Sequence, residues 1–235
     1  MIWSAPRKRR RRGPEAASNP PSAERVDPST RAAFLRKAGV FGGSIVAGSA
    51  GLGALPALAS AKSKSQNLAI LNFALTLEYL EAAFYKEAVR TSGTKGTAKR
   101  LTLKLATDEA ARVKFLKGAL GRNAVKSPKF NFRGTNHGSK KFLATAFALE
   151  NEGVQAYSGQ GPRLQNVDYV KAAISILTIE ARHAGAIALI NGGVSGKKGI
   201  TPNGAFDKPK KAHTVLNDVN SLKFTGKLKG GPGLD

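Results

Sequence analysis

Apolar side chains recur every three or four positions in four stretches of the chain: residues 66–90, 97–120, 139–160 and 167–191. This period is typical of an amphipathic α-helix that buries one face. No stretch alternates apolar and polar residues for long enough to predict a sheet. Short or moderate loops separate the four stretches, so the pattern predicts an all-α protein that folds as an antiparallel four-helix bundle.

The segments that flank these helices differ from them in composition. Residues 1–30 are rich in Pro, Ser and Arg and are expected to be a disordered basic extension. Residues 31–61 begin with basic residues, continue as a Gly/Ala-rich apolar stretch and end in Ala-Ser-Ala, which is typical of a cleaved export signal. An uncleaved membrane anchor is the alternative. The bundle then occupies 62–192, and 193–235 is an irregular basic tail in which only AHTVLNDVNSLKF is expected to pack.

The segment STRAAFLRK, residues 29–37, resembles the motif of twin-arginine export signals, although Ala32 stands in place of the second Arg. The resemblance implies a partner in the export machinery and a location in the periplasm, the cell wall or the extracellular space. Ordinary secretion of the unfolded chain stays open because of the missing Arg. A nuclear or nucleic-acid signal is an alternative reading of the RKRRRR run at residues 7–12.

The charge balance is strongly basic. The whole chain has 38 Lys and Arg against 15 Asp and Glu, and residues 62–235 keep a net charge of +16 with only twelve acids. Anionic envelope polymers are therefore candidate partners, whereas no motif predicts a specific nucleic-acid partner. The absence of cysteine excludes disulfides, zinc thiolates and a lipid-modified cysteine. The oligomeric state is left open.

The four predicted helices are two copies of one helical hairpin. In each copy the first helix has a Glu and, seven residues later, a Tyr; the second helix has a Glu and, three residues later, a basic residue. The matching pairs are Glu78/Tyr85 with Glu150/Tyr157, and Glu109/Arg112 with Glu180/His183. Matching Glu residues are 71 or 72 positions apart, so the same polar residues recur within the apolar seam of both copies.

Carboxylates in an apolar seam need an explanation, because an ionised group is strongly disfavoured there unless it is paired or coordinated. Four carboxylates that meet at about 4 Å would repel by on the order of 4 kcal/mol per pair at an effective dielectric constant near 20. They must bind protons or cations. Glu180 and His183 are three residues apart and therefore share one helix face. Oxygen ligands combined with imidazole suit iron or manganese.

Three motifs carry a resemblance to a known family: LNFALTLEYLEAAFY at 71–85, ALENEGVQAY at 148–157 and TIEARHAGAI at 178–187. They resemble the ferritin-like domain of exported bacterial proteins related to plant desiccation-related proteins. That resemblance implies the four-helix fold with a dinuclear carboxylate site built from two Glu and two Glu-x-x-His motifs. Carried over to this sequence, it implies metal ligation by Glu78, Glu109, Glu150, Glu180 and His183.

The chain departs from that pattern at Arg112, which stands where the second His is expected. A guanidinium offers no lone pair and stays charged, so Arg112 is not a ligand. Charge balance permits one iron or manganese ion, disfavours two and leaves a metal-free centre open. Alternatively, Arg112 turns out to solvent and leaves a dinuclear site that is poor in His. The tyrosines are expected to bond carboxylates, and Glu81 and Glu152 to lie beside the seam, hydrogen-bonded or solvated.

Three functions are open: two follow from the carboxylate seam, and the third, a basic polyanion-binding protein, follows from the net charge of +16. The first is an exported ferritin-like protein whose iron or manganese site serves metal oxidation or the removal of peroxide in oxidative stress. The alternative is a degenerate, metal-free bundle with a structural or desiccation-protective role in the cell envelope. Whether the chain is an enzyme is not decided by the sequence, which shows no Ser-His-Asp order, phosphate loop or dinucleotide fingerprint.

Overall fold

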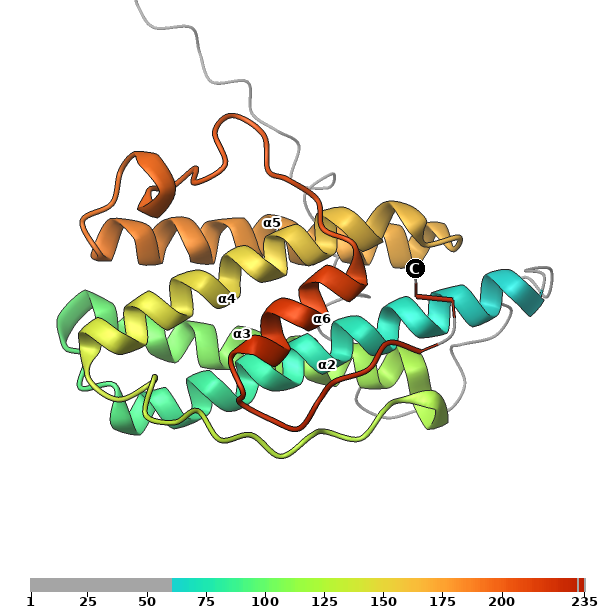
Figure 1. The fold of residues 1–235 in the computed structure, drawn as a ribbon, viewed down its shortest axis with the longest axis horizontal. Helices are drawn as coiled ribbons and strands as arrows, with labels where there is room; N and C mark the ends of the chain where they lie inside the picture. The colour runs from blue at the N-terminus through green and yellow to red at the C-terminus, as the bar shows by residue number, and fades with distance from the viewer. Residues whose placement is uncertain (1–60, 232, 235) are drawn as a thin grey trace, which may run out of the picture. The chain divides into compact units, whose positions relative to one another are not determined.

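Four long helices dominate the part of the chain that this computed structural model describes, residues 61–231 and 233–234 (Figure 1). They are α2 (Ala61–Thr91), α3 (Gly96–Leu120), α4 (Ser139–Gln160) and α5 (Val167–Ile190). The described residues contain no strand. The all-α prediction is confirmed, and only α2 differs by more than a residue or two, because it begins five residues earlier than its apolar period. The expected extension and export segment, up to residue 60, lie outside the described residues.

Each half of the bundle is a helical hairpin, and the halves are joined by a long crossover. α2 packs on α3 and α4 packs on α5, with further contacts of α2 with α4 and of α3 with α5. The backbone N–H of Val125 donates to Asn72 Oδ1 near the start of α2, and that of Gly138 donates to the carbonyl of Thr91 at its end. The connection between α3 and α4 therefore runs along α2 from Asn72 to Thr91, and all four adjacent helix pairs are antiparallel.

Local signals set several helix ends. Asn166 caps α5, because its side-chain oxygen accepts hydrogen bonds from the backbone N–H groups of Asp168 and Tyr169. Gly121 ends α3 at a positive φ of 54°, which glycine adopts without steric cost. Single 3₁₀ turns follow the long helices, at η1 (Gly121–Asn123), η2 (Gly161–Arg163) and η3 (Gly196–Lys198).

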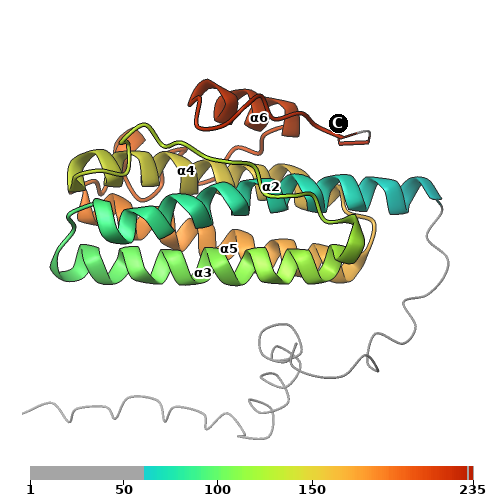
Figure 2. The same cartoon turned by 90° about the horizontal axis from the view of Figure 1, so that it is seen from below.

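The tail packs on the bundle through a short helix, as expected for AHTVLNDVNSLKF. α6 (Ala212–Ser221) buries Ala212, Val215, Leu216 and Val219 and lies on the side of α2 and α4, away from α3 and α5 (Figure 2). Just before α6, the carbonyl oxygen of Lys210 lies 1.9 Å from where a Cβ on Gly159 would be. Only glycine in α4 permits this approach. The Lys210 ammonium pairs with Glu152 at 2.6 Å, which confirms a hydrogen-bonded role for that acid.

An aromatic core holds the crossover and the tail to the hairpins. Phe84 of α2 contacts Phe132 of the crossover with ring centroids 5.3 Å apart, and Phe132 contacts Phe224 of the tail at the same distance. Phe142 of α4 stacks on Phe84 at 5.8 Å. Tyr85 belongs to the same core but turns its hydroxyl toward the bundle centre. The apolar core thus leads directly to the polar interior.

Candidate metal centre

Five of the twelve acids in residues 62–235 have buried side chains in the bundle centre. They come from all four long helices: Glu78, Glu81, Glu109, Glu150 and Glu180. Their oxygens fall into two overlapping clusters that share Glu109 and Glu180. Heptad-like spacing brings one acid of each helix to the seam, and the antiparallel packing of the hairpins brings the four seams together.

The first cluster, which we name the His183 cluster, consists of Glu109, Glu150, Glu180 and His183. Each residue offers one ligand atom, and these atoms lie within 4.8 Å of one another. His183 Nδ1 lies 3.1 Å from Glu150 Oε2 and 3.4 Å from Glu109 Oε1. Three carboxylates and one imidazole form a donor set that suits ferrous iron or divalent manganese.

Asp108 holds the other side of the His183 ring. His183 Nε2 lies 3.0 Å from Asp108 Oδ2, and the second Asp108 oxygen accepts a hydrogen bond from Lys104 at 2.5 Å. A carboxylate in this position fixes the tautomer and leaves Nδ1 free to ligate. Sequence reasoning missed Asp108, although it directly precedes Glu109, because its position on α3 is at the edge of the seam.

The second cluster, which we name the Arg112 cluster, consists of Glu78, Glu81, Glu109 and Glu180 around Arg112. Arg112 Nη1 donates a 2.6 Å hydrogen bond to Glu109 Oε2 and a hydrogen bond to Glu180 Oε1, and it lies 3.7 Å from Glu78 Oε2. The side chain of Arg112 is 8% exposed. The alternative in which Arg112 turns out to solvent is therefore wrong.

Glu81 is a further correction. It was expected to lie beside the seam, but it is 4% exposed and its carboxylate joins the Arg112 cluster. The reason is its spacing, since residues three apart on a helix share a face and Glu81 follows Glu78 by three. Glu180 and His183 share a helix face because they are three residues apart. The same spacing places Glu81 on the face of Glu78, so Glu81 is buried together with it.

The pKa shifts differ among four of the carboxyl groups: Glu78, Glu81, Glu109 and Glu150. Burial, followed by the negative charge of Glu109, raises the pKa of Glu78 well above its usual range, and burial with repulsion from Glu109 and Glu150 does the same to Glu81. Burial also raises the pKa of Glu150. For Glu109, His183 and Arg112 outweigh burial and lower the pKa. Glu78 and Glu81 are thus the carboxyl groups that hold protons most readily.

The pKa values of the two basic groups, His183 and Arg112, are raised as well, although burial alone would lower them. Burial disfavours the imidazolium of His183, but Glu109 and Glu150 outweigh it and raise the pKa of His183 to about 9. Burial likewise opposes the charge of Arg112, yet Glu78 and Glu109 keep its pKa above the ordinary value. His183 can give up its proton to a metal ion, whereas Arg112 remains a cation at any working pH.

Two tyrosines complete the centre with crossed hydrogen bonds. Tyr85 of the first hairpin donates to Glu150 Oε1 of the second, and Tyr157 of the second donates to Glu78 Oε1 of the first, both at 2.5 Å. The prediction that these tyrosines bond carboxylates is confirmed. Burial raises the pKa of both hydroxyls well above 10, so they act as donors. They orient one carboxylate in each cluster.

Buried carboxylate oxygens that lack a hydrogen-bond partner indicate whether a cation fits this centre. Glu109 Oε1 and Glu180 Oε2 have no hydrogen-bond partner although both side chains are fully buried, and the same holds for Glu78 Oε2 in the Arg112 cluster. Such an oxygen is costly unless a cation or proton meets it. The first two of these oxygens belong to residues of the His183 cluster, and Gly153 of α4 leaves Glu180 its space, because a Cβ there would lie 2.7 Å from Glu180 Oε2. A divalent cation therefore fits this donor set.

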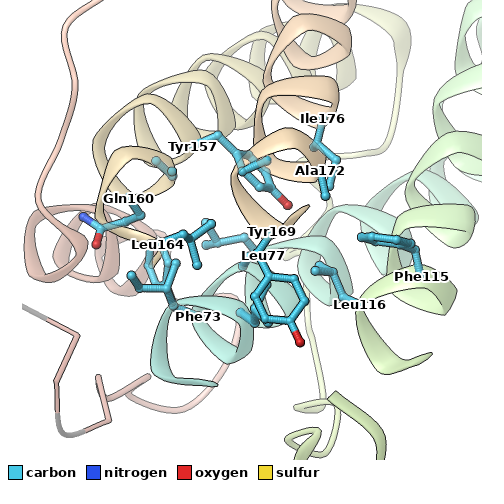
Figure 3. A pocket seen from close by; sticks show the side chains of 16 residues that line it. Phe73, Leu77, Phe115, Leu116, Tyr157, Gln160, Leu164, Tyr169, Ala172 and Ile176 are labelled. Carbon is cyan, nitrogen blue, oxygen red and sulfur yellow. The ribbon is translucent and has the colours of Figure 1, made fainter. Parts of the chain in front are cut away.

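An apolar cavity of about 20 Å³ borders the centre at Tyr157. Figure 3 shows the Tyr157 ring among apolar side chains of α2, α3 and α5, which include Leu77, Leu116 and Ile176. The ring lines this cavity and the hydroxyl of the same residue bonds Glu78. Tyr157 thus separates the apolar space from the carboxylates.

Of the residues that the sequence proposed as ligands, the structure brings Glu109, Glu150, Glu180 and His183 into one cluster and places Glu78 in the other. A search of curated proteins finds no match. The family model of the ferritin-like domain matches residues 66–192, which span α2 to the end of α5 and contain both clusters. This match covers more than half of the chain and agrees with the four-helix fold and its buried carboxylates. The chain therefore belongs to the ferritin-like domain family.

Proposed function

We propose that this protein binds one iron or manganese ion through Glu109, Glu150, Glu180 and His183. The observation that carries the proposal is the convergence of these four ligand atoms within 4.8 Å, together with partnerless buried oxygens on Glu109 and Glu180. Hard carboxylate oxygens and one imidazole favour these two metals over a structural zinc, which prefers four N or S ligands.

Charge balance supports a single ion. With Glu78 and Glu81 protonated, as their raised pKa values favour, three negative carboxylates remain. Arg112 contributes one positive charge and a divalent ion contributes two, so the centre is neutral when His183 has lost its proton. A second divalent ion would have to displace the protons of Glu78 and Glu81 and bind beside the buried guanidinium of Arg112, which repels it.

A bound iron or manganese ion supplies redox chemistry, and we propose that it serves metal oxidation or peroxide removal. The protein holds the imidazole through Asp108, orients Glu150 through Tyr85 and excludes bulk water by burial. The apolar cavity beside Tyr157 offers a small apolar molecule such as dioxygen a place next to the centre. Export to the cell envelope and binding of its anionic polymers belong to the same proposal.

The surface charge favours that polymer partner. Because five of the twelve acids in residues 62–235 are buried, at most seven can balance the many basic residues of the surface. Retention of the purified protein on a teichoic acid matrix should weaken as salt increases. Retention that does not change with salt would contradict an electrostatic partner.

Metal analysis tests the main proposal. The full chain, produced with iron and manganese available, should hold about one ion, and Glu180→Ala combined with His183→Ala should hold none. The matched control is Glu87→Ala with His137→Ala, which removes a Glu–His pair 3.5 Å apart at the surface and should keep the ion. A metal-free wild type would favour the alternative of a structural, stress-protective bundle.

A further inference from the structure

We propose that Arg112 serves as a built-in second cation and holds this ferritin-like centre to a single metal ion. The inference rests on the proposed function, because it assumes that the His183 cluster takes one ion. It concerns the Arg112 cluster, where the guanidinium nitrogen Nη1 contacts carboxylates from three helices: Glu78 of α2, Glu109 of α3 and Glu180 of α5.

The duplicated hairpin shows that Arg112 and His183 occupy equivalent places. Matching positions are 71 or 72 residues apart, which pairs Glu78 with Glu150 and Glu109 with Glu180. His183 Nδ1 faces Glu150 of its own half and Glu109 of the other half. Arg112 Nη1 faces the matching pair, Glu78 of its own half and Glu180 of the other. The crossed tyrosine bonds, both 2.5 Å long, follow the same symmetry.

Glu109 and Glu180 belong to both clusters, and Arg112 forms a hydrogen bond with only one oxygen of each. Arg112 bonds Oε2 of Glu109 and Oε1 of Glu180, and the other oxygen of each, Glu109 Oε1 and Glu180 Oε2, has no hydrogen-bond partner. Each carboxylate thus gives one oxygen to the guanidinium and keeps the other free of it, and the free oxygen of Glu109 lies 3.4 Å from His183 Nδ1. A carboxylate that bridges two metal ions is divided in the same way, so the guanidinium replaces one of the two cations.

A guanidinium differs from a metal ion in being permanent. It is covalently attached, stays charged and has no lone pair, so neither chelators nor acid remove it. The Arg112 side chain is nearly fully buried and its Nη1 lies among the carboxylates that would bind a second ion. Repulsion and lack of space therefore both exclude a second divalent ion from the Arg112 cluster.

The Arg112 cluster has kept the carboxylates of a metal site. By the repeat, Glu81 matches Gly153, so this half has one carboxylate more than the other. Four acids, Glu78, Glu81, Glu109 and Glu180, offer oxygens within 4.8 Å of one another. Only the imidazole is missing. Arg112→His supplies it at the position equivalent to His183 and removes the permanent charge, so it should create a second ion site.

The experiment uses the full chain loaded with Mn²⁺ as the probe, with stoichiometry from elemental analysis and electron paramagnetic resonance. Wild type should hold one Mn²⁺ per chain with the spectrum of an isolated ion. Arg112→His should hold two, with the exchange-coupled spectrum of neighbouring ions. The matched control is Arg100→His on the exposed face of α3, where Arg100 bonds Thr97, and it should hold one.

Each possible number of bound Mn²⁺ ions either supports or overturns the inference about Arg112. Two ions in wild type, or one in both wild type and a folded Arg112→His, would overturn the role of Arg112 while leaving metal binding intact. No ion in any variant would refute the proposed function itself. If Arg112→His fails to fold by circular dichroism, Arg112→Lys and Arg112→Gln replace it: the charged variant should keep one Mn²⁺ and the neutral variant should take up a second. Equal stoichiometry in those two would also overturn the inference.

Discussion

Gly153 offers a test of the centre that removes no candidate ligand. It lies in the interior of α4, opposite the carboxylate of Glu180. A Cβ at this position would lie 2.7 Å from Glu180 Oε2 and 3.2 Å from its Cδ. Ordinary van der Waals contact begins near 3.4 Å, so Gly153→Ala should displace this oxygen by roughly 0.7 Å. The atom displaced is the end of a flexible side chain, and the backbone of α4 can stay in place.

Gly153→Ala should therefore leave the stability of the metal-free protein nearly unchanged while it weakens metal binding. Alanine in a helix interior is favoured over glycine by about 1 kcal/mol, which offsets the strain of moving Glu180 and leaves the metal-free protein about as stable as wild type. A misplaced ligand, in contrast, should weaken metal binding by about 10- to 100-fold, the range seen when groups that orient ligands are changed. This range corresponds to about 1.4 to 2.8 kcal/mol.

Gly185 of α5 is the matched control, because it is also a glycine inside a helix and a Cβ there would meet no atom within 4 Å. Gly185→Ala should stabilise the protein by up to about 1 kcal/mol and leave Mn²⁺ affinity unchanged. Titration calorimetry with Mn²⁺ and urea unfolding of the metal-free proteins measure both quantities. Equal Mn²⁺ affinities of the two variants would refute the assignment of Glu180 as a ligand.

Three further predictions follow from the centre and the core. Tyr157→Phe leaves a buried carboxyl without its donor and should cost about 1–3 kcal/mol in urea unfolding, whereas Tyr79→Phe, which removes a 3.3 Å hydrogen bond at the surface, should cost less than 1 kcal/mol. Because the pKa of His183 is raised to about 9, a metal ion that binds this ring below pH 9 must displace its proton. The affinity for Mn²⁺ should therefore rise close to tenfold per pH unit up to about pH 9. An affinity that does not change with pH would argue against His183 as a ligand. Without metal the sign reverses, because the charged ring stabilises the fold fully below about pH 6.5 and this contribution is lost as pH rises through about 9. Phe84→Ala should destabilise by about 3–5 kcal/mol, since the ring is fully buried, while Phe206→Ala at an 86% exposed position should change the unfolding midpoint little.

The bundle and its polar seam could be predicted because their signals are local or repeated. Apolar residues at three-four spacing place the four helices within a few residues of their observed ends. The hairpin repeat then puts Glu109 and Glu180 in equivalent seams. Antiparallel packing of two hairpins with the same seam pattern brings such positions together, which is why the shared carboxylates could be predicted without coordinates.

The path of the crossover and the burial of Glu81 could not be predicted from the sequence, for a different reason. A loop of unknown path does not reveal which end of the bundle α4 starts from, and hydrogen bonds of residues 125 and 138 with α2 settle this. Glu81 lies at the margin of the apolar stripe on α2, so its exposure depends on how closely the neighbouring helices cover it. Its 4% exposure results from the packing of all four helices.

The sequence by itself determined that this protein is a four-helix bundle with carboxylates in a repeated seam, because helical period and residue spacing act along one chain segment. Only the tertiary structure decided that Arg112 turns inward, that Asp108 holds His183 and that the five acids divide into two clusters. The physical reason is that the rotamer of a long charged side chain depends on the charges around it. Those charges come from helices that are distant in sequence and meet only in the folded molecule.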